Sequence, residues 1–377
     1  MSDAVREPDR IEGAPHPRET PALIGQGAAE AEFLHAWNGG RLHHAWLLIG
    51  PRGVGKATLA WRIARFLLAT PDPDGDGGLF GDAPALPESL DIPADHPVAR
   101  RFLAGSDPGL KRVTRTENEK TGRLRDMIVA EDVRALGGFL SLSAADGGRR
   151  AIIIDSADDM NVQAANALLK MLEEPPARTT FLLVSHQPSG LLPTIRSRCR
   201  ALRLPPLDAD DMRAALAQAG IDVGAEAEAF AALSAGSVGA AVRLMNLGGL
   251  ETYRELIAIL SDMPRLDRAR ALKLANAAAA RGAEDRVDLL FTLIDLMLAR
   301  LARTGSLGAP PALEAAPEEG RTMTRLARGP HDARAWADCA QEVGARARHG
   351  LAVNLDPAAL VLDTVLKMRD TAAGVAR

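Results

Sequence analysis

The residues with the clearest chemical meaning occupy positions 50–58, where the chain reads Gly-Pro-Arg-Gly-Val-Gly-Lys-Ala-Thr. This stretch follows the phosphate-loop pattern Gly-x4-Gly-Lys-[Ser/Thr] up to Ala57, which replaces the hydroxyl that would hold Mg²⁺. The glycines let backbone N–H groups face phosphate oxygens, and Lys56 adds a positive charge. The sequence therefore predicts a phosphate cradle that lacks one metal ligand. The expected nucleotide-binding residues are Gly50, Pro51, Gly53, Val54, Gly55, Lys56, Ala57, Thr58 and Asp155.

An acidic residue follows an apolar run further along the chain. Asp155 has the position that usually steadies Mg²⁺ in phosphate-loop ATPases; the alternative is a strand-end or helix-capping carboxylate. An active ATPase also needs a neighbouring carboxylate to orient the attacking water, but the next residue is Ser156, which is no general base without a partner. Asp158 and Asp159 have a spacing that predicts they point along the following helix. Ala57 and Ser156 together indicate a nucleotide fold that does not catalyse.

Alternating strand and helix patterns must position these residues. Apolar runs predict strands, and helical spacing of apolar residues predicts helices between them. The expected strands are Ala45–Ile49, Ala151–Ile154 and Thr179–Ser185, and the expected helices are Leu59–Leu68, Glu131–Leu142 and Asn161–Leu172. This order predicts an α/β core with a parallel sheet between helices. In such folds ligands bind at the carboxyl ends of the strands, where the 50–58 loop, Asp155 and Ser185 all fall.

The rest of the chain is predicted to be helical. Strand signals end at Pro205-Pro206, and the sequence beyond is rich in helix formers. We expect a core at 1–206, with a flexible leader at 1–20 and an irregular insertion at 70–95, then a small helical lid at 207–247 and an all-α domain at 248–377.

Composition narrows the class of protein. The chain has 377 residues and a net charge of −4, so it has no overall basic character of the kind that binds nucleic acid. Its two cysteines, Cys199 and Cys339, exclude a disulfide framework and a four-cysteine zinc site, which leads us to expect a reducing, cytoplasmic location. No apolar run is long enough to predict a membrane span.

Two sequence blocks carry a family resemblance. They are Asn166–Pro176 (Asn-Ala-Leu-Leu-Lys-Met-Leu-Glu-Glu-Pro-Pro) and Thr194–Cys199 (Thr-Ile-Arg-Ser-Arg-Cys). Together with Leu23–Gln26, Leu42–Ala45 and the 50–58 loop, they resemble the clamp-loader subunits of bacterial DNA polymerase III, a group of AAA+ ATPases, as found in alphaproteobacteria. The resemblance weakens to a general helical match over the last third of the chain.

The resemblance implies a role for Arg198. In this family the arginine of Ser-Arg-Cys is an arginine finger that enters the ATP site of a neighbouring subunit, in trans. A guanidinium presents a rigid fork of donors to charge developing on the γ-phosphate, and such fingers contribute about 10³–10⁵ in rate. The alternative is that Arg196, Arg198, Arg200 and Arg203 form a solvated or DNA-facing basic edge.

The resemblance also implies partners. The all-α domain would be a collar through which five different subunits form a ring, containing clamp-loader ATPase subunits and the delta-like subunit that opens the clamp. The ring loads the sliding clamp on primed DNA, with primer–template DNA met only indirectly by this chain. A set of scattered basic residues is expected to form a solvated face, and the less favoured alternative is contact with DNA phosphates. These residues are Lys111, Arg112, Arg115, Lys120, Arg123 and Arg125.

Departures from the active members of the family favour a non-catalytic subunit of the polymerase holoenzyme. Gly239 stands where those members carry a sensor arginine, and the first sensor position is Ser185 or His186. ATP or ADP is expected to bind weakly or without hydrolysis, with Mg²⁺ doubtful. No cysteine occurs in Leu67–Arg115, so the family's zinc module is absent and no metal site is predicted. The alternatives are a working ATPase motor subunit and a phosphate-loop protein outside replication.

Overall fold

The computed structural model describes residues 10–71, 86–118, 122, 124–141, 148–280 and 282–376. The chain divides into two compact units, Met1–Ile221 with Ser237–Gly239, and Asp222–Gly236 with Ala240–Arg377. Part of the predicted leader (1–9) and of the predicted insertion (72–85) lies outside the described residues, and the three-part division remains a prediction.

A five-stranded parallel sheet forms the centre of the first unit. In spatial order its strands are β2 (Leu110–Val113), β3 (Arg150–Asp155), β4 (Thr179–Ser185), β1 (Ala45–Ile49) and β5 (Arg200–Arg203). Ile49 is paired with Ser185, and Asp155 with Val184, so β1, β3 and β4 end at the same edge. The predicted α/β core is confirmed, and β1 and β4 have the predicted bounds.

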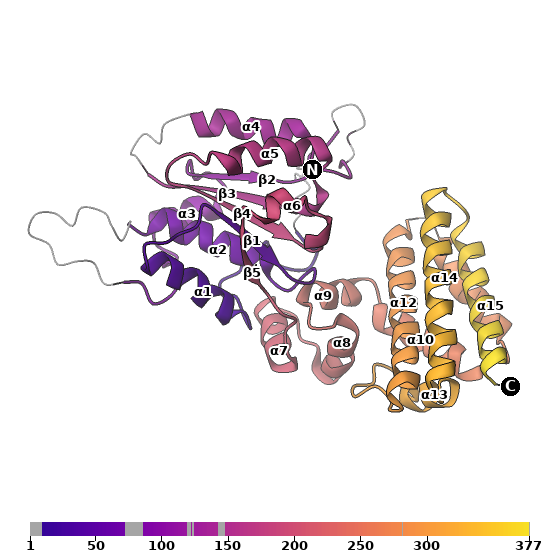
Figure 1. Ribbon diagram of the computed structural model, residues 1–377. Coiled ribbons are helices and arrows are strands. Elements are labelled where there is room, and N and C mark those ends of the chain that lie inside the picture. Colours follow the sequence, from indigo (N-terminus) through magenta and orange to yellow (C-terminus); the bar gives the residue numbers. More distant parts are fainter. Residues whose placement is uncertain are drawn as a thin grey trace, which may run out of the picture. The chain divides into compact units, whose positions relative to one another are not determined.

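Helices cover both faces of the sheet (Figure 1). The first layer packs on Trp46 and Leu48 of β1, and the second on Leu47 and Ile49, because alternate side chains of a strand point to opposite faces. The first layer contains α1 (Gly27–Asn38), α2 (Lys56–Ala69) and α3 (Pro97–Leu103). The second contains α4 (Ala130–Ser141), α5 (Val162–Glu173) and α6 (Pro193–Arg196). The unit also includes η1 (Ala157–Asp159), η2 (Pro188–Gly190) and α7 (Ala209–Gln218).

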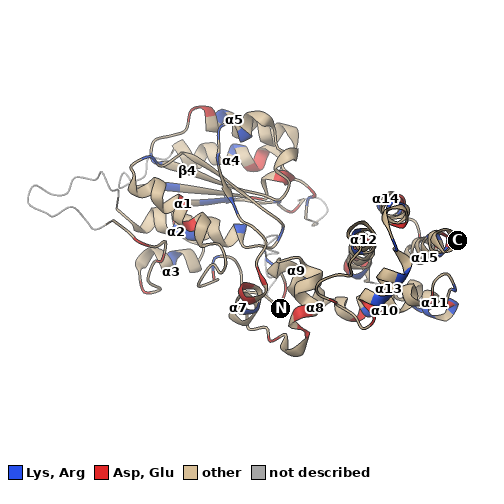
Figure 2. Cartoon of the chain, turned by 60° about the horizontal axis from the view of Figure 1, so that its bottom comes forward, with Lys and Arg blue, Asp and Glu red and all other residues tan. Residues whose placement is uncertain are grey.

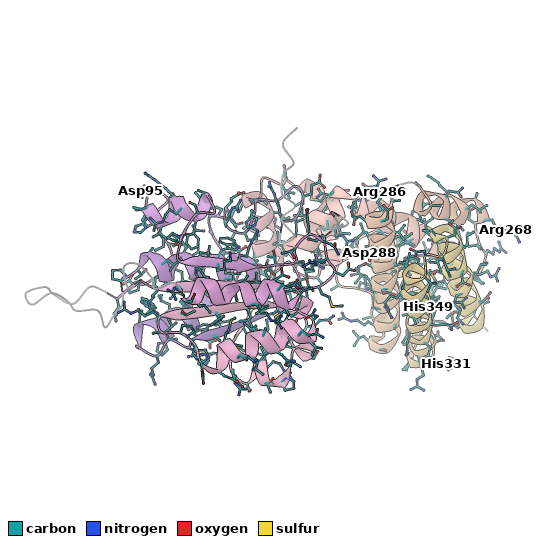
Figure 3. The ribbon with its side chains drawn as sticks, turned by 90° about the horizontal axis from the view of Figure 1, so that it is seen from above. Asp95, Arg268, Arg286, Asp288, His331 and His349 are labelled. Carbon is teal, nitrogen blue, oxygen red and sulfur yellow. The ribbon has the colours of Figure 1, made fainter. Side chains whose placement is uncertain are left out.

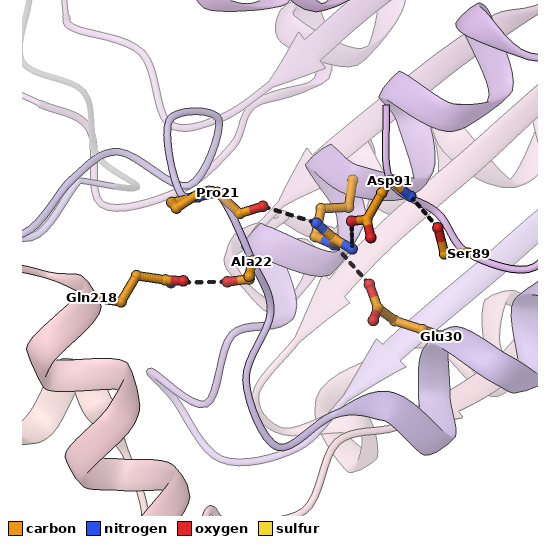
Figure 4. Close-up of polar contacts among 7 residues, drawn as sticks. Pro21, Ala22, Glu30, Ser89, Asp91 and Gln218 are labelled. Carbon is orange, nitrogen blue, oxygen red and sulfur yellow. Dashed lines mark hydrogen bonds and ion pairs between the residues drawn. The ribbon is translucent and has the colours of Figure 1, made fainter. Parts of the chain in front are cut away.

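A buried arginine holds the segment before α1 in place (Figure 4). The Arg62 side chain on α2 donates to the Pro21 carbonyl at 3.1 Å and pairs with Glu30 at 2.6 Å and Asp91 at 2.7 Å. A buried guanidinium needs several partners to offset its lost hydration. Arg62 therefore joins α2 to α1, to the segment before α1 and to the segment around Asp91.

Helices are the only regular secondary structure in the described residues of the second unit. Its helices are η3 (Gly224–Glu226), α8 (Ala227–Ser234), most of α9 (Val238–Asn246), α10 (Gly249–Asp262), α11 (Arg268–Ala278), α12 (Glu284–Leu307), α13 (Glu319–Leu326), α14 (Pro330–Ala352) and α15 (Pro357–Val375). Long helices α12, α14 and α15 pack side by side (Figures 1 and 2). This unit matches the prediction of an all-α C-terminal region.

A buried polar group also lies in this unit. Glu319 is fully buried, and its carboxylate accepts from Tyr253 Oη at 2.7 Å and Arg300 Nε at 2.7 Å. His331 lies at the surface, where its side chain is 94% exposed (Figure 3). Basic and acidic residues are interspersed on the helices seen in Figure 2. None of the described helices combines the length and apolar character needed to span a membrane.

Candidate functional site

The phosphate loop joins β1 to α2, which is the strand–loop–helix context the sequence predicts. Gly53 (φ 81°) and Gly55 (φ 101°) have left-handed backbone conformations that favour glycine. A Cβ on Gly50 would lie 2.2 Å from the Leu204 carbonyl oxygen. The loop glycines are therefore required by the fold itself, whether or not a phosphate is bound.

Lys56 is turned onto its own loop. Its side chain is buried, and Nζ donates to the carbonyl oxygens of Gly50 at 2.7 Å and Pro51 at 2.5 Å. Burial lowers the pKa of Lys56 to about 8, partly opposed by the negative charges of Asp155 and Asp158. The ammonium that would meet phosphate oxygens is already satisfied by backbone acceptors.

The outer side of the loop is held by three other segments. Gln26 Nε2 donates to the carbonyls of Val54 at 3.2 Å and Pro205 at 2.9 Å, which joins the loop to the end of β5. Ser237 Oγ donates to the Arg52 carbonyl at 2.7 Å. Much of the loop's backbone is thus fixed by the chain's own groups.

Gly239 contacts the loop through its backbone. Its N–H donates to the Gly53 carbonyl at 3.1 Å, and a Cβ on Gly53 would lie 2.9 Å from the Gly239 Cα and 2.4 Å from Ser237 Oγ. A Cβ on Gly239 would lie 2.7 Å from Ile11 Cδ1, the end of a flexible side chain, and 3.0 Å from the Gly53 Cα. At Gly239, where the family resemblance predicts that a sensor arginine is missing, the backbone itself contacts the loop.

The residues present fit a phosphate group better than a metal ion. The loop keeps the glycine conformations and the lysine of a cradle, but Ala57 has no hydroxyl and Ser156 stands after Asp155. Ser156 Oγ is buried, with no hydrogen-bond partner among the described residues. Within those residues no group of three His, Cys, Asp or Glu side chains could hold a metal ion.

Asp158 does not point along the following helix, so that prediction is wrong. Residues 157–159 form the short turn η1, which directs the Asp158 carboxylate to the end of β4. There it accepts from Ser185 Oγ at 2.7 Å, from the backbone N–H of His186, and from that of Gln187 at 3.3 Å. Asp158 therefore fixes the segment that holds the first sensor position.

His186 lies beside this carboxylate and is neutral at pH 7. Burial, with the positive charges of Lys56 and Arg52, lowers the pKa of His186 to about 4. Its Nδ1 is buried and has no partner among the described residues. Ser185, by contrast, is fully buried and already bonded. Of the two sensor candidates, only His186 keeps a polar atom without a partner in the described chain.

Arg198 follows the end of α6 by two residues, and its side chain reaches the surface. Its Nη2 pairs with Glu173 Oε1 at 3.0 Å and its Nη1 donates to the Thr194 carbonyl at 3.0 Å. The side chains of Arg198 and Glu173 are 36% and 45% exposed. The guanidinium is thus available at the surface and restrained by its own subunit.

The neighbouring basic residues have varied surroundings. Arg200 pairs with Glu32 at 3.1 Å and lies over the Trp46 ring, 5.0 Å from its centre. Of the scattered set predicted to be a solvated face, Arg115 is half-buried and pairs with Asp159 at 3.3 Å. Lys120 and Arg123 lie outside the described residues. Arg112 and Arg125 also have partners within the fold, His16 Nε2 at 3.3 Å and Thr116 Oγ1 at 3.2 Å.

Cys199 behaves as a small packed side chain. It is half-buried against the second helix layer, and burial raises the pKa of its thiol to about 12. A thiol that remains protonated is a weak nucleophile and a weak metal ligand.

Comparison with known proteins identifies relatives of the first unit. A family model described as "DNA polymerase III, delta subunit" matches residues 25–208. DNA polymerase III subunit delta' of Pseudomonas aeruginosa is 39% identical over 222 residues, which cover 58% of this chain and 61% of that protein. The same subunit of Escherichia coli is 31% identical over 178 residues, 46% of each protein. The chain thus spans about three fifths or less of the length of these relatives.

Solved structures show a weaker likeness. A DNA polymerase III gamma subunit-related protein of Thermotoga maritima is 14% identical, with 90% of this chain and 99% of that chain covered and a TM-score of 0.45. The RuvB Holliday junction branch migration motor of the same organism is 17% identical over 84% of this chain and 90% of that chain, with a TM-score of 0.37. At these values the likeness carries no argument about function.

Proposed function

We propose that the chain is a delta-prime-like clamp-loader subunit, because residues 25–208 match the family model described as "DNA polymerase III, delta subunit" and the curated relatives include delta' subunits. It assembles with ATPase subunits and a delta-like clamp-opening subunit in a hetero-pentameric ring. That ring loads the sliding clamp on primed DNA, and this chain contributes Arg198 to the ATP site of a neighbour. The 248–377 region serves as the collar of the assembly.

One contrast carries this proposal. The Arg198 side chain is 36% exposed and contacts one exposed carboxylate and one carbonyl, whereas Lys56 is buried on the carbonyls of its own loop. A cation at the surface can serve a second subunit, while one enclosed in the loop can serve only its own. Arg198 can therefore contribute to catalysis at the ATP site of a neighbouring subunit, whereas Lys56 is confined to its own loop.

The chain's own site is proposed not to hydrolyse nucleotide. Ala57 removes the Mg²⁺ hydroxyl, Ser156 replaces the second carboxylate, and Gly239 provides no cation. ATP or ADP bound at residues 50–58 would add phosphate charge for Lys56 and the loop to neutralise, and would stabilise the core by binding the folded state. The competing function is an active motor subunit, and the three departures all count against it.

ATP hydrolysis by the reconstituted complex tests the proposal. Wild type and Arg198→Ala are compared with clamp and primed DNA present, after a sizing column has shown intact assembly. Arg196→Ala is the matched control, since Arg196 is an exposed arginine at the end of α6. A large fall with Arg198→Ala alone is the expected result. Equal rates in all three complexes would contradict the trans role.

A further inference from the structure

The carboxylate that meets Arg198 occupies an unusual place. Glu173 is the last residue of α5, and Glu174 follows it as the C-cap. Carboxylates are electrostatically unfavourable at a helix C-terminus, where the backbone carries partial negative charge. The helix itself therefore gives no reason for an acid here, whereas a guanidinium 3.0 Å from Glu173 Oε1 does.

We infer that Glu173 is a positioning residue for Arg198, which holds the guanidinium on its own subunit until the γ-phosphate of a neighbour competes for it. The inference rests on the proposed function, because it needs Arg198 to act in trans. Glu173 itself does not contact the reacting atoms in this scheme. It acts only through the arginine.

Two contacts define the restrained state of Arg198. Nη2 faces Glu173, and Nη1 faces the Thr194 carbonyl, so both terminal nitrogens of the guanidinium have a partner in the same chain. A finger binds phosphate through these same N–H donors. While Nη2 remains on the carboxylate, it cannot give its full charge to a neighbour's nucleotide, and the two anions would repel each other.

The restraint is weak enough to be released. Both side chains are more than a third exposed, and exposed ion pairs contribute little to stability because water screens them. A γ-phosphate carries more negative charge than one carboxylate and binds a guanidinium strongly when water is excluded. Closing the interface between subunits would therefore shift Arg198 from Glu173 to the phosphate.

The test is Glu173→Gln in the reconstituted complex, which removes the charge and nearly preserves the shape. Without clamp and DNA, we expect kcat/KM for ATP to rise by roughly 2–5-fold, equivalent to about 0.4–1 kcal/mol. Glu174→Gln is the matched control, because it removes an adjacent carboxylate for which the described structure gives no ion pair. In an Arg198→Ala background, Glu173→Gln should have no effect on the rate.

The outcomes separate this inference from the proposed function. If Arg198→Ala lowers hydrolysis but Glu173→Gln leaves kcat/KM unchanged or reduces it, the inference is overturned and the trans role stands. The inference also fails if the effect of Glu173→Gln persists in the Arg198→Ala background, because Glu173 then acts by another route. No loss of hydrolysis with Arg198→Ala would remove the proposed function itself.

Discussion

The phosphate loop at 50–58 and the surface around Arg198 belong to the same unit, yet they hold their cations in opposite ways. Lys56 is 3% exposed and donates to two carbonyls of its own loop. Arg198 is 36% exposed and is held by Glu173 and the Thr194 carbonyl. One cation is part of the packed interior, and the other lies where a second protein can reach it.

This difference separates a cation that stabilises the fold from one that can act on a partner. Freeing Lys56 breaks two buried hydrogen bonds, and each buried group left unpaired costs about 1–3 kcal/mol. Freeing Arg198 from its exposed pair costs about 0–1 kcal/mol. A loop whose polar groups bond to one another can stay folded without a metal ion. An exposed arginine has an effect only through the groups that it contacts.

The largest expected effect comes from removing the Arg198 side chain. Arg198→Ala should lower hydrolysis at the recipient site about 10³-fold, because the transition state loses its charge and its fork of donors. Arg198→Lys should recover only part of the rate, since an ammonium is a point charge without that fork. Single-turnover hydrolysis by the assembled complex measures both. Full recovery with lysine would show that charge alone matters.

The next effect concerns the enclosed loop. Gly50→Ala should destabilise the fold by about 3 kcal/mol, because φ is 155° and the added Cβ meets the Leu204 carbonyl. Gly137→Ala is the control: this helical glycine has open space around it, so alanine should stabilise by about 0.5–1 kcal/mol. Urea unfolding gives both values. A tolerated Gly50→Ala would mean that the loop is less tightly enclosed than described.

Asp158→Asn should weaken the end of β4. An amide cannot replace all three hydrogen bonds accepted by the carboxylate, and we expect a loss of about 2 kcal/mol. Asp210→Asn, on an exposed carboxylate of α7, should change stability by less than about 0.5 kcal/mol. Urea midpoints of the two variants provide the comparison. Similar midpoints would indicate that Asp158 is dispensable for folding.

The smallest effect is a pH dependence of nucleotide binding. A bound phosphate favours the protonated lysine, so it raises the pKa of Lys56 from about 8. Below pH 8 the ammonium is already charged and Kd should be nearly constant. Above pH 8 binding must take up a proton, so Kd should rise by up to about tenfold per pH unit.

Titration calorimetry with ADP between pH 7 and 9.5 measures this dependence. Lys56→Arg is the control, because arginine stays charged over this range and should remove the slope. A wild-type Kd that is flat from pH 7 to 9.5 would show that the buried lysine does not meet phosphate. Loss of binding in both proteins would instead place the defect in the loop.

The apolar patterns predicted the inner sheet well and its edges poorly. Thr179–Ser185 is a run of buried residues, which periodicity detects directly. β2 reads Leu-Lys-Arg-Val and β5 reads Arg-Ala-Leu-Arg, so each is short and carries charges. These edge strands owe their conformation to pairing with β3 and β1, which no local pattern contains.

The candidate site was predictable where it depends on contiguous residues. The 50–58 loop and the departures at Ala57 and Ser156 could be read directly from the sequence. The direction of Asp158 depends on a short turn, and the pairing of Glu173 with Arg198 joins positions 25 residues apart. Such contacts arise from tertiary packing, and only the fold reveals them.

The backbone contact between Gly53 and Gly239 limits which side chains the two positions accept. Both residues lack a side chain where the two segments meet, and a Cβ on Gly239 would lie 2.7 Å from Ile11 Cδ1 and 3.0 Å from Gly53 Cα. A longer side chain at 239 would therefore require the 237–239 turn or the phosphate loop to shift. In this way the residue tolerated at 239 is linked to the position of the loop.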